Sequence, residues 1–144
     1  MRAYLDTSAV VKLLISEAGS EDLTVWLDAA LLASSRVTFV EAHAAIARRE
    51  REATSSRAAC AMARDQFRRD WPAYTVVDVT AALSVVAADF AETFGLRGFD
   101  AVQLASAHAV QTAVPGPMSF IAFDRRLNRA AKLLGLDLPA WALQ

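Results

Sequence analysis

Four acidic residues stand where carboxylates from distant parts of the chain could act on one substrate. Asp6 and Asp124 each directly follow a short apolar stretch, whereas Glu41 and Asp100 lie in the first turns of expected helices. In an open parallel α/β sheet the carboxyl ends of the strands share one edge, and ligands bind at that edge. If the apolar stretches are strands of such a sheet, the four carboxylates converge on one cleft.

Converging carboxylates favour a bound divalent cation. Like charges at close range force at least one pKa upward, and a hard cation removes that penalty. Mg²⁺ prefers oxygen ligands and is typically held by one or two carboxylates together with substrate phosphate. Such an ion lowers the pKa of a bound water and stabilises charge on a leaving oxygen. Since His43, His108 and Cys60 have no metal-ligand partner nearby in the sequence, a zinc site is not expected.

Each acid also has a purely structural explanation. Thr38 and Glu41 have the spacing of a capping box. Asp6 fits a helix N-cap, and Asp100 and Asp124 fit acids at helix N-termini, where the macrodipole stabilises them by about 0.3–1 kcal/mol. Each structural explanation is adequate for a single residue. Taken together the four acids are explained less well in this way, because Asp6 and Asp124 directly follow strongly apolar stretches.

The elements that would position these acids follow from the apolar pattern. Strands are expected at 2–5, 31–34, 74–79 and 119–123. Helices are expected at 8–16, 20–30, 38–52, 57–70, 81–94, 100–112 and 125–134, and one more short strand in the tail. We expect Thr7 or Ser8 to cap the first helix and Thr38 to cap the third. Strands that alternate with helices predict an α/β fold, a three-layer α/β/α sandwich with a short, mostly parallel central sheet.

Composition limits the class of protein. The 144 residues are 55% apolar and 22% charged, which predicts one folded domain over 1–144. A net charge of −1 excludes a global positive field. The single cysteine, Cys60, excludes a disulfide framework and favours a reducing cytoplasm. The stretch 101–123 lacks charged residues, but its polar side chains and Pro-Gly-Pro turn predict a buried helix and strand rather than a membrane span.

Four segments carry a family resemblance: 4–14 (YLDTSAVVKLL), 37–50 (VTFVEAHAAIARRE), 96–109 (LRGFDAVQLASAHA) and 120–136 (FIAFDRRLNRAAKLLGL). In order and spacing they resemble the signature segments of PIN-domain ribonucleases, most closely the VapC-type toxins of bacterial toxin–antitoxin pairs. The resemblance covers essentially the whole chain. It implies a compact α/β/α sandwich and Mg²⁺- or Mn²⁺-dependent cleavage of RNA phosphodiester bonds.

The resemblance also implies roles for the four acids. Asp6 and Asp100 would be the principal metal ligands, and Glu41 and Asp124 would complete the acidic pocket through bound waters or a second metal. The expected chemistry is in-line attack of metal-activated water on phosphorus, which leaves 5′-phosphate and 3′-hydroxyl ends. The number of metals stays open.

Neighbouring polar residues are candidates for substrate binding. A hydroxyl of Thr7 or Ser8 could orient the Asp6 carboxylate or contact phosphate, although helix capping would also explain both residues. Arg97 precedes Asp100 in a glycine-bracketed loop and could bind phosphate or pair with a pocket acid. Arg125 is a candidate for the same role. Gln103 stands where relatives often have histidine, a position expected to serve packing or to support the site indirectly.

Arginines concentrate between residues 48 and 69, on the two middle helices. Beside an acidic metal pocket they would guide an RNA backbone by phosphate contacts. Interleaved acids give the alternative of a solvated, salt-bridged face, and the sequence leaves the two open. The tryptophans are expected to pack rather than to stack on bases.

The VapC resemblance further implies an antitoxin partner and a homodimer. An antitoxin segment would lie in an apolar groove between early helices, for which Val11, Leu14, Leu23 and Trp26 are candidates, unless all four belong to the core.

Other functions fit the sequence less well. An aspartyl phosphatase usually has a second aspartate two residues after the first, where this chain has Ser8. A phospho-accepting signalling domain needs a lysine after a late strand, where Asp124 stands. A non-catalytic RNA-binding PIN module often loses pocket acids, whereas all four are present here. A housekeeping RNA-processing nuclease remains the alternative to a toxin.

Overall fold

A computed structural model of the chain describes residues 1–15 and 20–143. The last residue of the first expected helix, Ser16, therefore lies outside the described part. The elements in chain order are β1 (Arg2–Leu5), α1 (Thr7–Leu14), α2 (Ser20–Trp26), β2 (Leu31–Ser35), α3 (Arg36–Arg51), α4 (Arg57–Asp70), η1 (Trp71–Ala73), β3 (Thr75–Val77), α5 (Ala81–Phe94), α6 (Gly98–Ala113), β4 (Ser119–Ile121), α7 (Arg125–Leu133) and η2 (Ala140–Leu143).

The four strands form one parallel sheet in the order β3-β2-β1-β4. In the register of the sheet, Tyr4 of the central strand β1 is paired with Ala33 on one side and Phe120 on the other. The predicted parallel sheet is confirmed, but β3 and β4 are shorter than the apolar stretches that predicted them. In place of the short strand expected in the tail, Asp137 forms only an isolated parallel bridge with Ser119.

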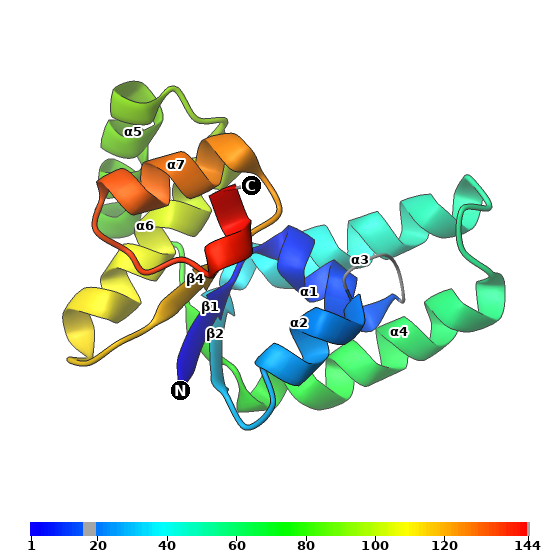
Figure 1. Cartoon of the computed structure of the whole chain (residues 1–144). Helices are drawn as coiled ribbons and strands as arrows, with labels where there is room; N and C mark the ends of the chain where they lie inside the picture. The colour runs from blue at the N-terminus through cyan, green and yellow to red at the C-terminus, as the bar shows by residue number, and fades with distance from the viewer. Residues whose placement is uncertain (16–19, 144) are drawn as a thin grey trace.

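Helices cover both faces of the sheet (Figure 1). Successive strand side chains point to opposite faces. Accordingly, Ala3 and Leu5 pack with residues of α1, α2 and α3, whereas Tyr4 packs with residues of α5, α6 and α7. Phe120 and Ile121 of β4 divide between the two layers in the same way. This alternation gives the predicted three-layer α/β/α sandwich. None of the helices in the described residues is long and apolar enough to cross a membrane.

Three helices begin at residues other than those predicted: α1 at Thr7, α3 at Arg36 and α6 at Gly98. Asp6, and not Thr7 or Ser8, caps α1 by accepting a hydrogen bond from the backbone N–H of Ala9. Ser35 caps α3, because β2 passes directly into this helix. Thr38 is consequently buried inside α3, and the capping box with Glu41 does not form. The structural explanation for that glutamate is thereby removed.

The C-terminal tail supports the loop between β4 and α7. The buried Asn128 side chain donates hydrogen bonds of 2.9 Å to the backbone carbonyls of Ala122 and Ala142. Trp141 stacks on Phe123 with ring centroids 4.9 Å apart. The tail therefore holds the segment that carries Asp124.

We expect Asn128→Ala to lower the free energy of unfolding by about 2–3 kcal/mol, because two buried carbonyls lose their donor. Lys132→Ala on the same helix is the matched control, since Lys132 is exposed and its replacement should change stability by no more than about 0.5 kcal/mol. Urea denaturation of both variants measures the difference. A loss below about 1 kcal/mol for Asn128→Ala would show that the tail does not depend on this side chain.

Candidate active site

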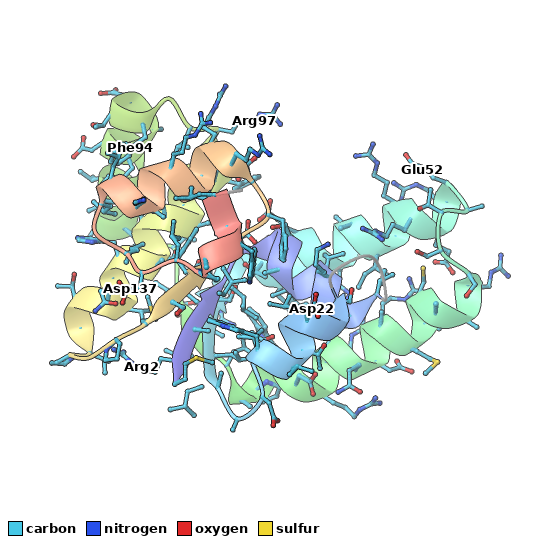
Figure 2. All side chains as sticks on the ribbon, viewed as in Figure 1. Arg2, Asp22, Glu52, Phe94, Arg97 and Asp137 are labelled. Carbon is cyan, nitrogen blue, oxygen red and sulfur yellow. The ribbon has the colours of Figure 1, made fainter. Side chains whose placement is uncertain are left out.

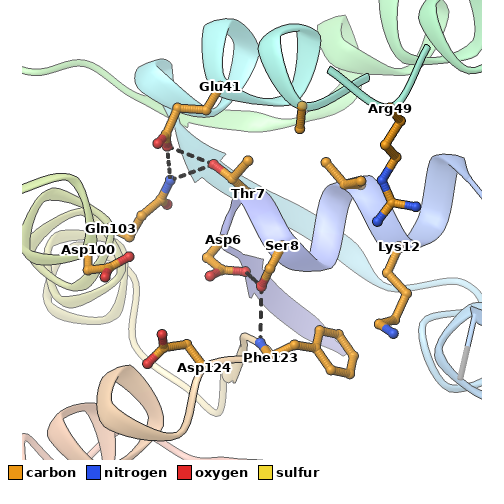
Figure 3. A pocket seen from close by; sticks show the side chains of 12 residues that line it. Asp6, Thr7, Ser8, Lys12, Glu41, Arg49, Asp100, Gln103, Phe123 and Asp124 are labelled. Atoms are coloured by element: carbon orange, nitrogen blue, oxygen red, sulfur yellow. Dashed lines mark hydrogen bonds between the residues drawn. The ribbon is translucent and has the colours of Figure 1, made fainter. Parts of the chain in front are cut away.

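The acids meet at the carboxyl edge of the sheet, between β1 and β4. The connection that leaves β1 runs over the α1–α4 layer, whereas the helices α5 and α6 that lead into β4 lie on the opposite face. Neighbouring strands with connections on opposite faces define a switch point, the usual ligand site of such sheets. A cavity of about 480 Å³ opens there (Figure 3), lined by Asp6, Thr7, Ser8, Val11, Lys12, Glu41, Ala45, Arg49, Asp100, Gln103, Phe123 and Asp124.

Asp6 is the most buried of the four acids, with 5% of its surface exposed. Its Oδ1 accepts hydrogen bonds from the Ser8 hydroxyl at 2.6 Å and from the Ala9 backbone N–H at 3.0 Å. Burial and, to a smaller extent, the charges of Asp100 and Asp124 nevertheless raise the pKa of Asp6 to about 7, against the effect of these two hydrogen bonds. The protein thus holds an acid here that a nearby cation would keep ionised.

Ser8 connects Asp6 to the loop after β4. Its hydroxyl donates to the Asp6 carboxylate and accepts from the backbone N–H of Phe123 at 3.0 Å (Figure 3). Of the two hydroxyls named from the sequence, Ser8 is therefore the one that orients Asp6. Thr7 instead donates a 2.7 Å hydrogen bond to Oε1 of Glu41.

Gln103 is the centre of the hydrogen-bond network that holds Glu41. Its amide nitrogen lies 2.9 Å from the Thr38 hydroxyl, 3.2 Å from the Thr7 hydroxyl and 3.3 Å from Oε1 of Glu41. Its amide oxygen accepts a 2.6 Å hydrogen bond from the buried Tyr4 hydroxyl. The side chain is only 2% exposed. Sequence reasoning gave Gln103 an indirect role, and the structure makes that role the orientation of a pocket acid.

Asp100 and Asp124 close the acidic end of the cavity. Asp100 lies in the first turn of α6, and its pKa is raised by burial and then by the charges of Asp124 and Glu41, while Arg97 opposes the increase. Asp124 caps α7 by accepting a 2.8 Å hydrogen bond from the Leu127 N–H. The helix N-cap suggested for Asp6 is thus confirmed, and Asp124, expected as an acid at a helix N-terminus, is also an N-cap. Both residues also line the cavity.

The basic residues around the cavity differ from those predicted. Arg125 is not among the side chains that line it, and Arg97 lines an adjacent cavity of about 660 Å³ together with Glu41 and Asp100. Lys12 and Arg49 do line the main cavity, and neither was singled out from the sequence. A signal for Arg49 existed, because it lies eight residues after Glu41 and hence on the same helix face.

The donor set fits a hard cation in its chemistry. All four acidic side chains offer carboxylate oxygens, which suit Mg²⁺ or Mn²⁺. The charges of Asp100 and Asp124 raise the pKa of Asp6, and those of Asp124 and Glu41 raise the pKa of Asp100. The four carboxyl groups are not preassembled, however. Within residues 1–15 and 20–143, no three acidic, histidine or cysteine side chains lie close enough together to hold a metal ion as they stand.

The sheet order, the switch-point cavity and its four acids define an α/β/α protein with a carboxylate-lined site. A family model for the PIN domain matches residues 3–133, and the chain belongs to the PIN domain family, as its four segments predicted. It is 39% identical over 135 residues to "Ribonuclease VapC45" and to "Ribonuclease VapC49" from two strains of Mycobacterium tuberculosis. The match covers 92% of this chain and 90% of each relative.

Solved structures share the fold. FitAcB from Neisseria gonorrhoeae superimposes with a TM-score of 0.66 at 16% identity, over 94% of this chain and 95% of that one. VapBC2 from Rickettsia felis, bound to a DNA fragment from their promoter, gives a TM-score of 0.63 at 14% identity, over 96% and 98% of the two chains. At these identities the likeness concerns the fold alone.

Proposed function

We propose that this protein is a metal-dependent endoribonuclease and the toxin of a toxin–antitoxin pair. The observation that carries the proposal is the cavity at the switch point of the sheet, with all four carboxylates on its wall. The 39% identity to two curated VapC ribonucleases supports RNA as the substrate and a toxin as the class.

In the proposed mechanism Asp6 and Asp100 would hold Mg²⁺ or Mn²⁺, and Glu41 and Asp124 would complete the pocket. The bound cation supplies an activated water and stabilises charge on the leaving oxygen. Ser8 holds the Asp6 carboxylate in place through its hydrogen bond. A water oxygen would attack phosphorus in line with the P–O3′ bond, which breaks, and the departing 3′ oxygen would take up a proton. The products would carry 5′-phosphate and 3′-hydroxyl ends, and the 2′-hydroxyl would not be the nucleophile.

Cleavage of end-labelled total RNA by the protein without its antitoxin tests this function. We expect discrete fragments with Mg²⁺ or Mn²⁺ and none with EDTA, and we expect every new 5′ end to accept a ligase, because it carries phosphate. Fragments that form equally in EDTA, or that carry 2′,3′-cyclic phosphate, would rule out the metal-activated water. Comparison of the two metals at equal concentration identifies the preferred one.

The positioning role of Gln103 gives a separate prediction. Gln103→Leu should lower kcat by about tenfold or more, because Glu41 loses a donor and the Tyr4 hydroxyl loses its acceptor. Gln103→His keeps a donor and should retain kcat within about threefold while adding a pH dependence near neutrality. The measurement is the pH profile of kcat for both variants. Equal losses in the two would indicate a packing role without orientation of Glu41.

A protein partner belongs to the same proposal. A second cavity of about 520 Å³, between α1, α2, β2 and α4, is lined by apolar side chains such as Leu13, Leu14 and Phe67, and by the polar side chains of Thr24, Gln66 and Asp70. Of the four groove candidates named from the sequence, Leu14 lines this cavity. Val11 and Leu23 are buried in the core, and Trp26 packs against the core without lining the cavity. We propose this cavity as a site for an antitoxin segment.

The homodimer is likewise a proposal. Val40 and Phe99 are 68% and 61% exposed, and each directly precedes a pocket acid. We propose that these two exposed apolar side chains belong to the dimer interface. Light scattering of the protein and of Phe99→Glu, which should weaken association, measures the oligomeric state.

A further inference from the structure

The main cavity is charged oppositely at its two ends. The carboxylates of Asp100 and Asp124 lie at one end, and the side chains of Lys12 and Arg49 lie together at the other (Figure 3). A further cavity of about 710 Å³ continues along α3 and shares Ala45 and Arg49 with the main one. We call the path formed by these two cavities the basic groove. Lys12 and Arg49 line the part next to the acids, and Arg48, Arg51 and Glu52 line the outer part. The groove leads toward Glu52 at the far tip of the α3–α4 hairpin (Figure 2).

Lys12 is fixed against the wall of the groove. Its ammonium nitrogen lies 4.5 Å from the centroid of the Phe123 ring, a cation–π contact. Phe123 is itself held by the stacked ring of Trp141 and by its backbone hydrogen bond to Ser8. The positive charge of Lys12 is therefore positioned by the same loop that carries Asp124.

Two other arginines of the α3–α4 hairpin pair with glutamates of the same hairpin. Arg64 makes two hydrogen bonds to the Glu50 carboxylate, at 3.1 and 3.4 Å, and Arg48 pairs with Glu52 at 3.0 Å. These contacts support the salt-bridged face that the sequence left as one of two possibilities. Arg49 differs from Arg48 and Arg64 because it lines the cavity that contains the acids.

The spacing along the helices separates the cations from the acids. Lys12 follows Asp6 by six residues and Arg49 follows Glu41 by eight, which at about 1.5 Å per residue places the backbone positions about 9 and 12 Å apart. Ala45 lies between Glu41 and Arg49, and its methyl group leaves the path between them open. A polyanion with one phosphate at the acidic end would therefore present a different phosphate to the cations.

We propose that the basic groove binds the backbone of single-stranded RNA on one side of the cleaved phosphodiester bond, with Lys12 and Arg49 each contacting a phosphate. This inference rests on the proposed nuclease function and assigns the direction in which substrate leaves the acidic pocket, over Ala45 toward the tip of the hairpin. The groove contributes affinity, and the bond cleavage itself belongs to the acids.

The test uses RNA binding, which separates the groove from the chemistry. Lys12→Gln and Arg49→Gln are made in the Asp100→Asn protein, and the Kd for a short fluorescein-labelled single-stranded RNA is measured by anisotropy in EDTA at several salt concentrations. Each variant should raise Kd by about tenfold or more. Each should also lower the slope of log Kd against log salt by about 0.7, the value for one lost phosphate contact on a single strand.

Matched controls remove a positive charge elsewhere. Lys132→Gln and Arg69→Gln alter exposed side chains that line neither cavity of the groove, and both should bind RNA as the parent does. Lys12→Arg keeps the positive charge and should therefore keep the parental slope of log Kd against log salt. If Lys12 had a purely structural role, the slope would not depend on its charge. In the cleavage-competent protein, Lys12→Gln and Arg49→Gln should raise KM for RNA and leave kcat unchanged.

The outcomes distinguish the groove from the proposed function. If the protein cleaves RNA with metal but Lys12→Gln and Arg49→Gln bind RNA as the controls do, the groove is overturned and the nuclease stands. If the variants lose affinity only for a protein partner, the groove binds an acidic polypeptide and the RNA assignment is wrong. If the parent neither binds nor cleaves RNA, both proposals fail.

Discussion

Asp100→Asn and Asp6→Asn should each lower metal-dependent RNA cleavage by at least about 10³-fold. A metal site stabilises transition-state charge by several kcal/mol, and each 1.36 kcal/mol corresponds to a factor of about ten in rate. Both substitutions keep the size and shape of the side chain while removing a negative charge that the proposed cation requires. Single-turnover cleavage with saturating enzyme measures the effect on the chemical step.

The fold should survive both substitutions. Asparagine caps a helix about as well as aspartate, so the amide oxygen of the Asp6→Asn variant can still accept the Ala9 N–H at the start of α1. Asp89→Asn, an exposed change of the same kind on α5, is the matched control and should cleave RNA at the parental rate. Full activity in both pocket variants, with circular dichroism unchanged, would refute the assignment of the metal ligands.

The position of the site could be predicted from the sequence because it depends on few features. Asp6 and Asp124 directly follow apolar stretches, and the carboxyl ends of parallel strands meet at one edge. The rule that ligands bind where the carboxyl ends of parallel strands meet needs no knowledge of side-chain contacts. It predicted the convergence of the acids although β3 and β4 proved to be shorter than their apolar stretches.

Helix starts were harder to predict, since a cap is defined by where the strand ends and not by residue type alone. Thr38 has the spacing of a capping box with Glu41, yet β2 continues to Ser35 and the helix begins at once. The hydroxyl of Thr38 then turns inward and accepts a hydrogen bond from Gln103. A local pattern cannot report this, because the two residues are 65 positions apart.

Lys12 and Arg49, the two cations of the basic groove, could not be paired from the sequence for a different reason. Lys12 lies on α1 and Arg49 on α3, and only the packing of these helices places them on one cavity. In the sequence, Arg49 is one of several arginines interleaved with acids. Which of these arginines line the groove follows from side-chain positions, as the pairing of Arg64 with Glu50 illustrates.

Without metal, the ionised carboxylate of Asp6 should lower the free energy of unfolding at neutral pH. Asp6→Asn, which cannot ionise, should restore it. The pKa of Asp6 is raised from 3.8 to about 7 in the folded state. A raised carboxyl pKa favours folding while the group is protonated, so its contribution is complete below about pH 4 and is lost as the pH rises to about 7. At about 1.4 kcal/mol per pK unit, the loss is at most about 4 kcal/mol.

Urea denaturation of the metal-free protein and of Asp6→Asn between about pH 4 and pH 8 measures this difference. The variant should match the parent at the acidic end of this range and exceed it at the alkaline end, with Asp89→Asn unchanged relative to the parent throughout. Adding Mg²⁺ or Mn²⁺ at the alkaline end should stabilise the parent by about 2.7 kcal/mol at about one hundred times Kd and leave Asp6→Asn nearly unaffected. A variant less stable than the parent there would mean that the hydrogen bonds to Asp6 outweigh its burial. Equal metal stabilisation of both proteins would place the cation away from Asp6.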